Sequence, residues 1–233
     1  METGSGTAII LADGDAPTAA QLDLAWPNWA DDVTLVIAAD GGARHAPGLG
    51  LRIDCWVGDG DSIGDDALAD LAASGVEIRR VAEAKDESDT ELALALAIER
   101  GAGQVVVLGA FGGVRLDHAL ANVGLLAMPA LAGRPAALLD ERSRVRLVQA
   151  PGPDGGPVRL GLPGRTGDLV SLLPYGHGVE GVTTEGLAYP LRDEPLPAGP
   201  ARGLSNVRTG NAAAVTVRSG LLLVVETPAT LVG

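Results

Sequence analysis

The sequence contains few aromatic residues and a single cysteine, and each shortage excludes a class of protein. Phe, Trp and Tyr make up 3% of its 233 residues. The hydrophobic core must therefore consist of Val, Leu, Ile and Ala, which suits parallel strands covered by Ala-rich helices. Cys55 cannot form an internal disulfide, and no CxxC pair or Cys/His cluster is present to bind zinc. We expect a protein of a reducing compartment without a zinc site.

Long apolar runs and excess positive charge are also missing. The apolar run Ala8–Ala12 is too short for the core of a signal peptide and lacks a basic leader. No uncharged apolar stretch approaches the roughly 18 residues that span a bilayer. With 17 basic and 30 acidic residues the formal net charge is −13, which argues against binding to nucleic acid or anionic lipid. We expect a cytoplasmic protein with no membrane or nucleic-acid partner, whose small ligands are cations or metal-bound anions.

Charge and proline divide the chain near residue 142. Residues 1–142 contain 23 of the 30 acids and 9 of the 17 bases, whereas 10 of the 15 prolines follow this point. In the first part, short apolar runs alternate with helical patterns, which predicts an α/β domain with a mainly parallel sheet over residues 1–142. The second part has only strand-like runs separated by Gly and Pro, which predicts a small antiparallel β domain over residues 143–233.

The predicted strands of the first part are Ala8–Leu11, Leu35–Ala38, Cys55–Val57, Val105–Leu108 and Ala136–Leu139, and its clearest helices are Thr90–Arg100 and Leu116–Leu131. The predicted strands of the second part are Val158–Leu162, Leu169–Leu173, Ala213–Arg218 and Leu221–Glu226.

Acidic side chains follow three apolar runs of the first part. They are Asp40 after Leu35–Ala38, Asp59 and Asp61 after Cys55–Val57, and Asp86, Glu87 and Asp89 after Glu77–Val81. Ligands of open α/β sheets bind beyond the carboxyl ends of the strands, so we expect these acids at one edge. Like charges held close together are costly unless a cation neutralises them, and Mg²⁺ prefers carboxylate oxygens. The pattern predicts a magnesium site, with Lys85 as a compact cation among the acids.

A glycine-rich segment follows the strand Val105–Leu108. It contains Gly109, Gly112 and Gly113 and ends at Arg115. Such a turn from strand to helix exposes backbone N–H groups that hold phosphate, and an arginine can bind the same phosphate bidentately. If the next helix begins at Asp117, His118 and Asn122 share a helix face near this segment. Carboxylates for Mg²⁺ together with a phosphate-binding segment predict nucleotide-dependent phosphoryl transfer.

Two short motifs have competing interpretations. Ser88 and Glu91 fit a capping box, with Ser88 as N-cap. Residues 60–64 have the G-x-S-x-G spacing of a hydrolase nucleophile elbow, which would make Ser62 a nucleophile, with His118 or His177 as its base. Ser62 with Asp65 equally predicts a helix cap, which we favour. A Walker A loop is excluded because the only lysine does not follow a glycine.

The segments in chain order resemble the thiamin pyrophosphokinase family. They read AADGGA, VGDGDSI, KDESDTELAL, GAFGGVRLDHALANV, GDLVSLLP, GVTTEGLAYPL and GLSN, and run from about Ala8 to Val225. The resemblance implies an enzyme with an α/β catalytic domain that binds ATP and Mg²⁺, followed by a β-sandwich domain that binds thiamine. It implies transfer of a pyrophosphoryl group from ATP to the hydroxyethyl group of thiamine, giving thiamine diphosphate and AMP. It also implies a homodimer with active sites at the interface.

The resemblance also assigns residues, which we carry over motif by motif. It implies that Asp59, Asp61 and Asp89 bind magnesium and serve catalysis. The nucleotide set that it implies is Asp40, Gly41, Gly42, Lys85, Gly109, Gly112, Gly113, Arg115, Asp117, His118 and Asn122. Ser205 and Asn206 would line the thiamine pocket. Two positions depart from the family pattern, because Ser88 stands where threonine is commoner and Val114 lengthens the glycine-rich segment.

Two other functions stay open on the sequence. One is a pyrophosphokinase for another hydroxymethyl heterocycle such as a pterin, and the other is a non-catalytic protein that binds nucleotide or thiamine. The VTTEGL and GLSN segments favour thiamine over a pterin, and the complete set of acids favours an enzyme over a sensor.

Overall fold

The computed structural model describes residues 6–231 and divides into two compact units. Within the described range, unit 1 comprises residues 6–125 and 134–141, and unit 2 comprises residues 126–133 and 142–231. Across residues 6–231, none of the helices is long and apolar enough to cross a lipid bilayer.

Unit 1 contains a six-stranded parallel sheet in the order β6-β5-β1-β2-β3-β4. Its strands are β1 (Thr7–Leu11), β2 (Val33–Ala39), β3 (Cys55–Gly58), β4 (Glu77–Arg80), β5 (Gln104–Leu108) and β6 (Ala136–Leu139). Its α-helices are α1 (Ala19–Ala25), α2 (Ala46–Leu49), α3 (Asp65–Ala73), α4 (Asp89–Glu99) and α5 (Leu116–Leu125), and the short 3₁₀ helix η1 (Asp40–His45) follows β2. All five apolar runs predicted as strands of this part are strands.

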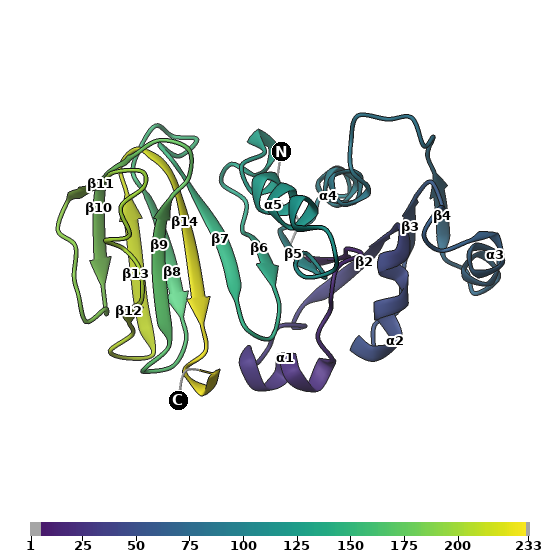
Figure 1. Ribbon diagram of the computed structural model, residues 1–233, viewed down its shortest axis with the longest axis horizontal. Helices are drawn as coiled ribbons and strands as arrows, with labels where there is room; N and C mark the ends of the chain where they lie inside the picture. Colours follow the sequence, from purple (N-terminus) through teal and green to yellow (C-terminus); the bar gives the residue numbers. More distant parts are fainter. Residues whose placement is uncertain (1–5, 232–233) are drawn as a thin grey trace. The chain divides into compact units, whose positions relative to one another are not determined.

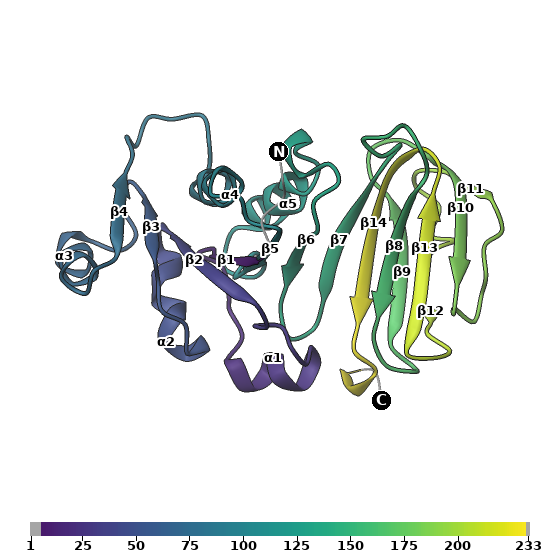
Figure 2. The same cartoon turned by 180° about the vertical axis from the view of Figure 1, so that it is seen from behind.

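Helices cover both faces of this sheet. Figure 1 shows α4 and α5 on one side and α1 and α2 on the other, and Figure 2 shows the same layers from behind. All five residues of β1 are buried, as expected for a strand covered on both faces. Ile9 and Leu11 pack with Leu22 of α1 and Leu68 of α3, so one core joins the sheet to these helices.

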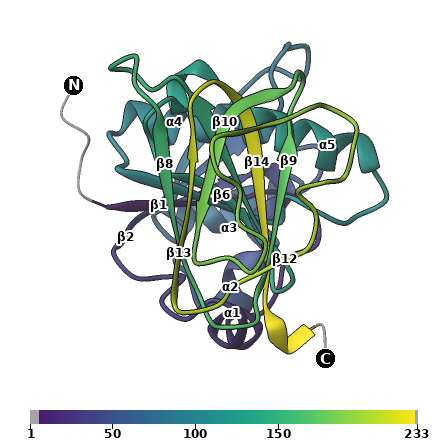
Figure 3. The ribbon, with the colours of Figure 1, turned by 90° about the vertical axis from the view of Figure 1, so that its left-hand side faces the viewer.

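Unit 2 is a sandwich of two antiparallel sheets, in the orders β12-β9-β14-β7 and β11-β10-β13-β8. Figure 3 shows β8, β13 and β10 next to one another. The strands are β7 (Arg144–Ala150), β8 (Val158–Pro163), β9 (Leu169–Pro174), β10 (Val179–Glu185), β11 (Glu194–Leu196), β12 (Asn206–Val207), β13 (Ala212–Val217) and β14 (Gly220–Thr227). Two short 3₁₀ helices, η2 (Pro129–Leu131) and η3 (Ala229–Leu231), complete the unit. The inner faces share an aliphatic core that includes Leu162, Leu172 and Leu222.

The predicted fold class is therefore confirmed, with one helix predicted too long. The expected helix Leu116–Leu131 ends at Leu125. A proline at position 129 disfavours helical backbone at Met128 before it, and the chain continues as η2. Leu126 and Leu131 belong to unit 2 rather than to unit 1.

Candidate active site

The carboxyl ends of four strands in unit 1 lie at one edge of the sheet. In the parallel register, Leu11 of β1 pairs with Ala38 of β2 and with Leu108 of β5, and Ala39 of β2 pairs with Val57 of β3. The chain continues from β1 toward β2 on one side, whereas β5 lies on the other side of β1. This is the topological switch point at which open α/β sheets bind ligands.

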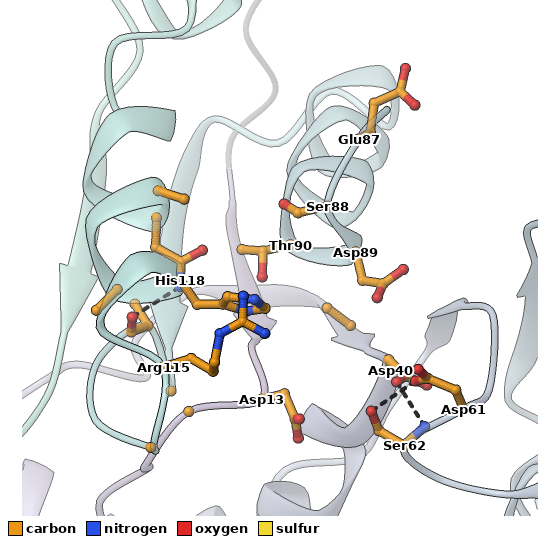
Figure 4. Close-up of a pocket in the computed structure, with 18 of the residues that line it drawn as sticks. Asp13, Asp40, Asp61, Ser62, Glu87, Ser88, Asp89, Thr90, Arg115 and His118 are labelled. Atoms are coloured by element: carbon orange, nitrogen blue, oxygen red, sulfur yellow. Dashed lines mark hydrogen bonds between the residues drawn. The ribbon is translucent and has the colours of Figure 1, made fainter. Parts of the chain in front are cut away.

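Three carboxylates converge at this edge. Asp40 begins the turn after β2, and Asp59 and Asp61 lie in the turn after β3. One carboxylate oxygen of each lies within 4.8 Å of the others. Figure 4 shows Asp40, Asp61 and Ser62 together, with Asp89 near them at the start of α4. Asp40, Asp59 and Asp61 form the carboxylate cluster that we refer to below.

Asp40 is the buried member of the carboxylate cluster, with 3% of its surface exposed. Its backbone carbonyl accepts a hydrogen bond from Trp56 Nε1 at 3.0 Å, and its Oδ2 accepts one from the Ser62 backbone N–H at 3.2 Å. Its Oδ1 is buried and has no hydrogen-bond partner among the described residues. Burial raises the pKa of the Asp40 carboxyl above its usual value. An unpartnered buried carboxylate oxygen fits a hard cation as its partner.

Asp59 has the opposite electrostatic environment. The backbone N–H of Asp61 donates to its Oδ1 at 3.0 Å, and Lys85 Nζ lies 3.3 Å from its Oδ2. The Asp61 N–H and then the Lys85 ammonium hold the pKa of Asp59 below its usual value. Arg80 Nε also donates to the Asp59 backbone carbonyl at 3.1 Å, which fixes the turn. Asp59 is therefore ionised and oriented at neutral pH.

Asp89 joins this group through Lys85. Ser88 caps α4 by accepting a hydrogen bond from the Glu91 backbone N–H at 3.2 Å, which confirms the predicted N-cap. Asp89 is the next residue, and its Oδ1 lies 3.0 Å from Lys85 Nζ. The structure therefore places Asp89 beside Asp59 across the lysine, whereas Asp40 takes the position next to Asp59 and Asp61.

The glycine-rich segment lies at the end of β5. Gly109, Gly112 and Gly113 have φ values of 70°, 74° and 69°, a backbone region that favours glycine. Asn122 of α5 donates its side-chain amide to the Ala110 carbonyl at 2.9 Å, which holds the segment against the helix. Val114 is fully exposed.

Arg115 binds Asp117 in this structure. Its Nε lies 2.9 Å from Asp117 Oδ1, and Nη2 lies 2.5 Å from Oδ2. The Arg115 guanidinium lowers the pKa of Asp117 to about 2. Both side chains are exposed, so this ion pair is weak and Arg115 can exchange it for a stronger anion.

These segments line a cavity of about 480 Å³. The predicted site residues that line it are Asp40, Asp59, Asp61, Lys85, Asp89, Gly109, Gly112, Gly113, Arg115, His118 and Asn122. Seven carboxylates and two cationic side chains line it, so with His118 neutral its formal charge is −5. In Figure 4, Arg115 and His118 lie across the cavity from Asp40 and Asp61.

Three residues that were predicted to bind the nucleotide, Asp117, Gly41 and Gly42, do not line this cavity. Asp117 pairs with Arg115 and does not line the cavity. Gly41 and Gly42 are buried in η1 and do not line the cavity. A Cβ at Gly42 would lie 2.0 Å from the Leu11 carbonyl oxygen, so the residue allows close approach of two backbones.

The loop after β1 also contributes to the site, although no sequence motif indicated it. Asp13 and Gly14 line the cavity, and Asp15 Oδ2 accepts a hydrogen bond from the Gly113 backbone N–H at 3.1 Å. The same loop is also held by Arg44 of η1, whose Nη2 donates to the Asp13 carbonyl at 2.6 Å. A signal was nevertheless present, because acids follow the apolar run of β1 as they follow those of β2 and β3.

Ser62 does not cap a helix, which corrects our favoured interpretation of its motif. The N-cap of α3 is Gly64, and no side chain caps it. Ser62 Oγ instead donates to Asp61 Oδ1 at 2.9 Å. Among the described residues no hydrogen bond joins Ser62 to a histidine, so the arrangement of a hydrolase nucleophile is not formed.

Ser205 and Asn206 lie in unit 2. Asn206 lines a separate pocket of about 350 Å³ together with Tyr189 and Leu204. Its Oδ1 accepts from the Tyr189 backbone N–H at 2.9 Å, and its Nδ2 donates to the Tyr189 carbonyl at 2.6 Å. Ser205 has a φ of 57°, and its backbone N–H donates to Ser171 Oγ at 3.0 Å.

Comparison with known proteins agrees with this architecture. The chain is similar to the thiamine pyrophosphokinase of Bacillus subtilis (strain 168), with 23% identity over 198 residues that cover 85% of this chain and 89% of the relative. The crystal structure of a Bacillus subtilis thiamine pyrophosphokinase has the same fold, with a TM-score of 0.79, 23% identity, and coverage of 95% of this chain and 99% of that one. A thiamin pyrophosphokinase from Candida albicans matches with a TM-score of 0.74 and 16% identity, over 96% of this chain and 89% of that one.

Two family models match the two parts of the chain. The model described as thiamin pyrophosphokinase, catalytic domain, matches residues 26–135. The model described as thiamin pyrophosphokinase, vitamin B1 binding domain, matches residues 159–222. Since these matches together span most of the sequence, the chain belongs to the thiamin pyrophosphokinase family, whose enzymes use ATP to convert thiamine into thiamine diphosphate.

Proposed function

We propose that the cavity of unit 1 is the site at which this enzyme transfers a pyrophosphoryl group from ATP to thiamine. The observation that carries the proposal is the carboxylate cluster at the strand ends, which shares one cavity with the glycine-rich segment and Arg115. A cavity with a formal charge of −5 repels free ATP, so it needs a cation to accept the nucleotide.

Magnesium is the cation that these residues fit best. Asp40, Asp59 and Asp61 each offer one carboxylate oxygen within 4.8 Å of the others, which supplies three oxygen ligands from two turns, and Asp40 Oδ1 has no hydrogen-bond partner among the described residues. Asp89 contacts the same Lys85 ammonium as Asp59, and it completes the set of acids. When bound, Mg²⁺ neutralises charge on the β- and γ-phosphates.

We assign ATP to the opposite side of the cavity. Arg115 exchanges Asp117 for a phosphate, which binds more strongly because it carries more charge. The segment Gly109–Gly113 places its backbone beside the nucleotide, while Asn122 holds the segment in place through Ala110. Lys85 and His118 line the same cavity and complete the nucleotide set.

The proposed reaction is a displacement at the β-phosphorus of ATP. The thiamine hydroxyl oxygen forms a bond to the β-phosphorus, and the bond from that phosphorus to the oxygen bridging to the α-phosphorus breaks. AMP leaves with the electron pair, and the hydroxyl proton passes to a carboxylate of the cluster. An alcohol is a weak nucleophile, so in-line positioning by the cavity supplies much of the rate.

We place thiamine against the pocket of unit 2 in a homodimer. Asn206 holds both backbone polar groups of Tyr189, whose side chain is 70% exposed. An exposed aromatic ring on a backbone held in this way suits the thiazolium cation. Val114, Leu116 and Leu120 are exposed apolar residues beside the ATP cavity, and burial against a second subunit would cover them. We place the enzyme in the cytoplasm, because a chain with one cysteine has no internal disulfide, as is usual for proteins of a reducing compartment.

Product analysis tests this function. The protein is incubated with ATP, Mg²⁺ and thiamine, and the products are separated by chromatography. Thiamine diphosphate and AMP in equal amounts are expected. Formation of ADP would indicate an ordinary kinase. Turnover when a hydroxymethyl pterin replaces thiamine, but not with thiamine itself, would indicate the other pyrophosphokinase. No turnover with either acceptor would indicate a binding protein.

A further inference from the structure

Lys85 is the only lysine in the 233 residues, and its ammonium lies between acids from two different segments. Nζ is 3.3 Å from Asp59 Oδ2 and 3.0 Å from Asp89 Oδ1. The side chain is 14% exposed, in a loop between β4 and α4. Asp59 also belongs to the carboxylate cluster, so Lys85 already occupies part of the surroundings that a metal ion needs.

We infer that Lys85 is an internal counter-ion, which competes with the divalent cation for Asp59 and moves to the ATP phosphates when metal and nucleotide bind. The inference rests on the proposed function of the cavity. Without a cation, Asp40, Asp59, Asp61 and Asp89 repel one another, and the ammonium neutralises one of these charges. When a divalent cation binds Asp59, it repels the ammonium.

The chemistry of lysine suits this exchange. Its charge is a compact point at the end of a flexible four-carbon stem, so it can change partners without moving the backbone. Lys85 lines the same cavity as Gly112, Gly113 and Arg115, so phosphate bound there lies within the cavity that Lys85 faces. Asp86 and Glu87 follow it in sequence but do not pair with it among the described residues.

The exchange predicts effects of opposite sign for Lys85→Met. Loss of a positive charge next to the cluster should tighten binding of a divalent cation to the nucleotide-free protein by roughly tenfold. The same variant should bind ATP in the presence of metal several-fold more weakly, because a phosphate partner is lost. If Lys85 only holds the loop in place, Lys85→Met should weaken both metal binding and ATP binding, or neither of them.

Mn²⁺ is the probe, because it accepts the same oxygen ligands as Mg²⁺ and its free form is measured by electron paramagnetic resonance. Titrations compare the wild type with Lys85→Met, Lys85→Arg and Arg52→Met, all without nucleotide. Lys85→Arg keeps the charge and should stay within about threefold of the wild type. Arg52→Met is the matched control for lost charge, because Arg52 forms an exposed pair with Asp54 and does not line the cavity.

Asp61→Asn separates failure of this inference from failure of the proposed metal site. If Asp61→Asn weakens Mn²⁺ binding but Lys85→Met does not tighten it, Lys85 does not compete with the metal and the inference is wrong. If Asp61→Asn has no effect, the cluster is not the metal site and the proposed function loses its support.

A measurement on the wild type keeps the inference testable if Lys85→Met does not fold. Acetylation of Lys85 by an amine-selective reagent is followed by mass spectrometry with and without saturating Mg²⁺. The rate should rise several-fold with Mg²⁺, because the ammonium leaves its two carboxylates. An unchanged rate would overturn the inference.

Discussion

Asp40 combines burial with an oxygen that has no protein partner among the described residues. Its backbone is held by Trp56, and its φ of 42° is unusual for a residue with a side chain. Gly58 permits this approach, because a Cβ there would lie 2.9 Å from that of Asp40. We expect such a residue to destabilise the fold while it supplies a ligand to the proposed metal site.

Asp40→Asn should therefore stabilise the metal-free protein while removing most turnover. Because burial raises the pKa of Asp40 in the folded protein, its protonated carboxyl adds to the free energy of unfolding below the usual aspartate pKa. This contribution is lost as the pH rises through the raised pKa. An amide avoids that loss at neutral pH, and we expect a gain of about 1 kcal/mol. Thermal unfolding with EDTA at pH 5 and pH 7.5 checks this. A variant that is less stable than the wild type at both pH values would contradict it.

Ser62→Ala should retain at least about half of the wild-type turnover. The substitution removes one exposed hydrogen bond to Asp61 and keeps the backbone N–H that donates to Asp40. Steady-state rates of AMP formation check it. Loss of more than about a thousandfold, as for a covalent nucleophile, would support the hydrolase interpretation instead.

At the scale of single residues, the sequence predicted that acidic side chains lie close together but not which hydrogen bonds they form. Strand ends indicated Asp40, Asp59 and Asp61 correctly as neighbours, because parallel register brings them to one edge. The backbone bond from Ser62 to Asp40 was not predictable, because it depends on the path of a turn whose serine fitted a helix cap equally well.

The loop after β1 is joined to the glycine-rich segment by hydrogen bonds. Asp15 receives the Gly113 N–H, and its own backbone N–H donates to the Phe111 carbonyl at 2.8 Å. Gly14 N–H donates to the Gly109 carbonyl at 2.8 Å. Three hydrogen bonds from one short loop therefore fix the backbone of the glycine-rich segment.

Asp15→Ala should raise the KM for ATP about three- to tenfold with a smaller change in kcat, because it frees the Gly113 N–H and loosens the segment. Asp15→Asn keeps an oxygen that can accept this hydrogen bond, so it should restore a KM near that of the wild type. Steady-state kinetics with varied ATP measure both. Equal KM values for the alanine variant and the wild type would show that Asp15 does not position the segment.

Elements were predictable where apolar residues run together and not where charge interrupts them. The strands β1, β3 and β5 are short apolar runs that the sequence shows directly. β7 was missed because Arg144 and Arg146 interrupt its apolar pattern. Both arginines bind the buried Glu226 of β14, at 2.8 and 2.6 Å, so tertiary pairing compensates for charges that argue against a strand.

The whole enzyme requires residues of both units if thiamine binds to unit 2 as we propose. The carboxylate cluster lies in unit 1, whereas Asn206 and the exposed Tyr189 lie in unit 2. Composition predicted two parts of the chain, because most of its acids come before residue 142. Assembly leaves no such pattern in a single sequence, so the homodimer rests on the proposed function.

Mixed dimers test this assembly. Subunits carrying Asp61→Asn are combined with subunits carrying Asn206→Ala, both expected to be inactive alone. If each site uses Asn206 of the neighbour, one site in a mixed dimer is intact, and about a quarter of the wild-type activity should return for random pairing. A mixture of Asp59→Asn and Asp61→Asn subunits is the control and should stay inactive. Dimers without recovered activity would place both residues in a site formed by one chain.

The most direct test of the catalytic metal site is the turnover number of Asp61→Asn, measured as AMP formation with thiamine and saturating ATP and Mg²⁺. Asp66→Asn is the matched control, because Asp66 is an exposed acid outside the cavity. We predict a loss of at least about a hundredfold for Asp61→Asn and a change within about twofold for Asp66→Asn. A folded Asp61→Asn variant with near wild-type turnover would contradict the assignment of the carboxylate cluster as the catalytic metal site.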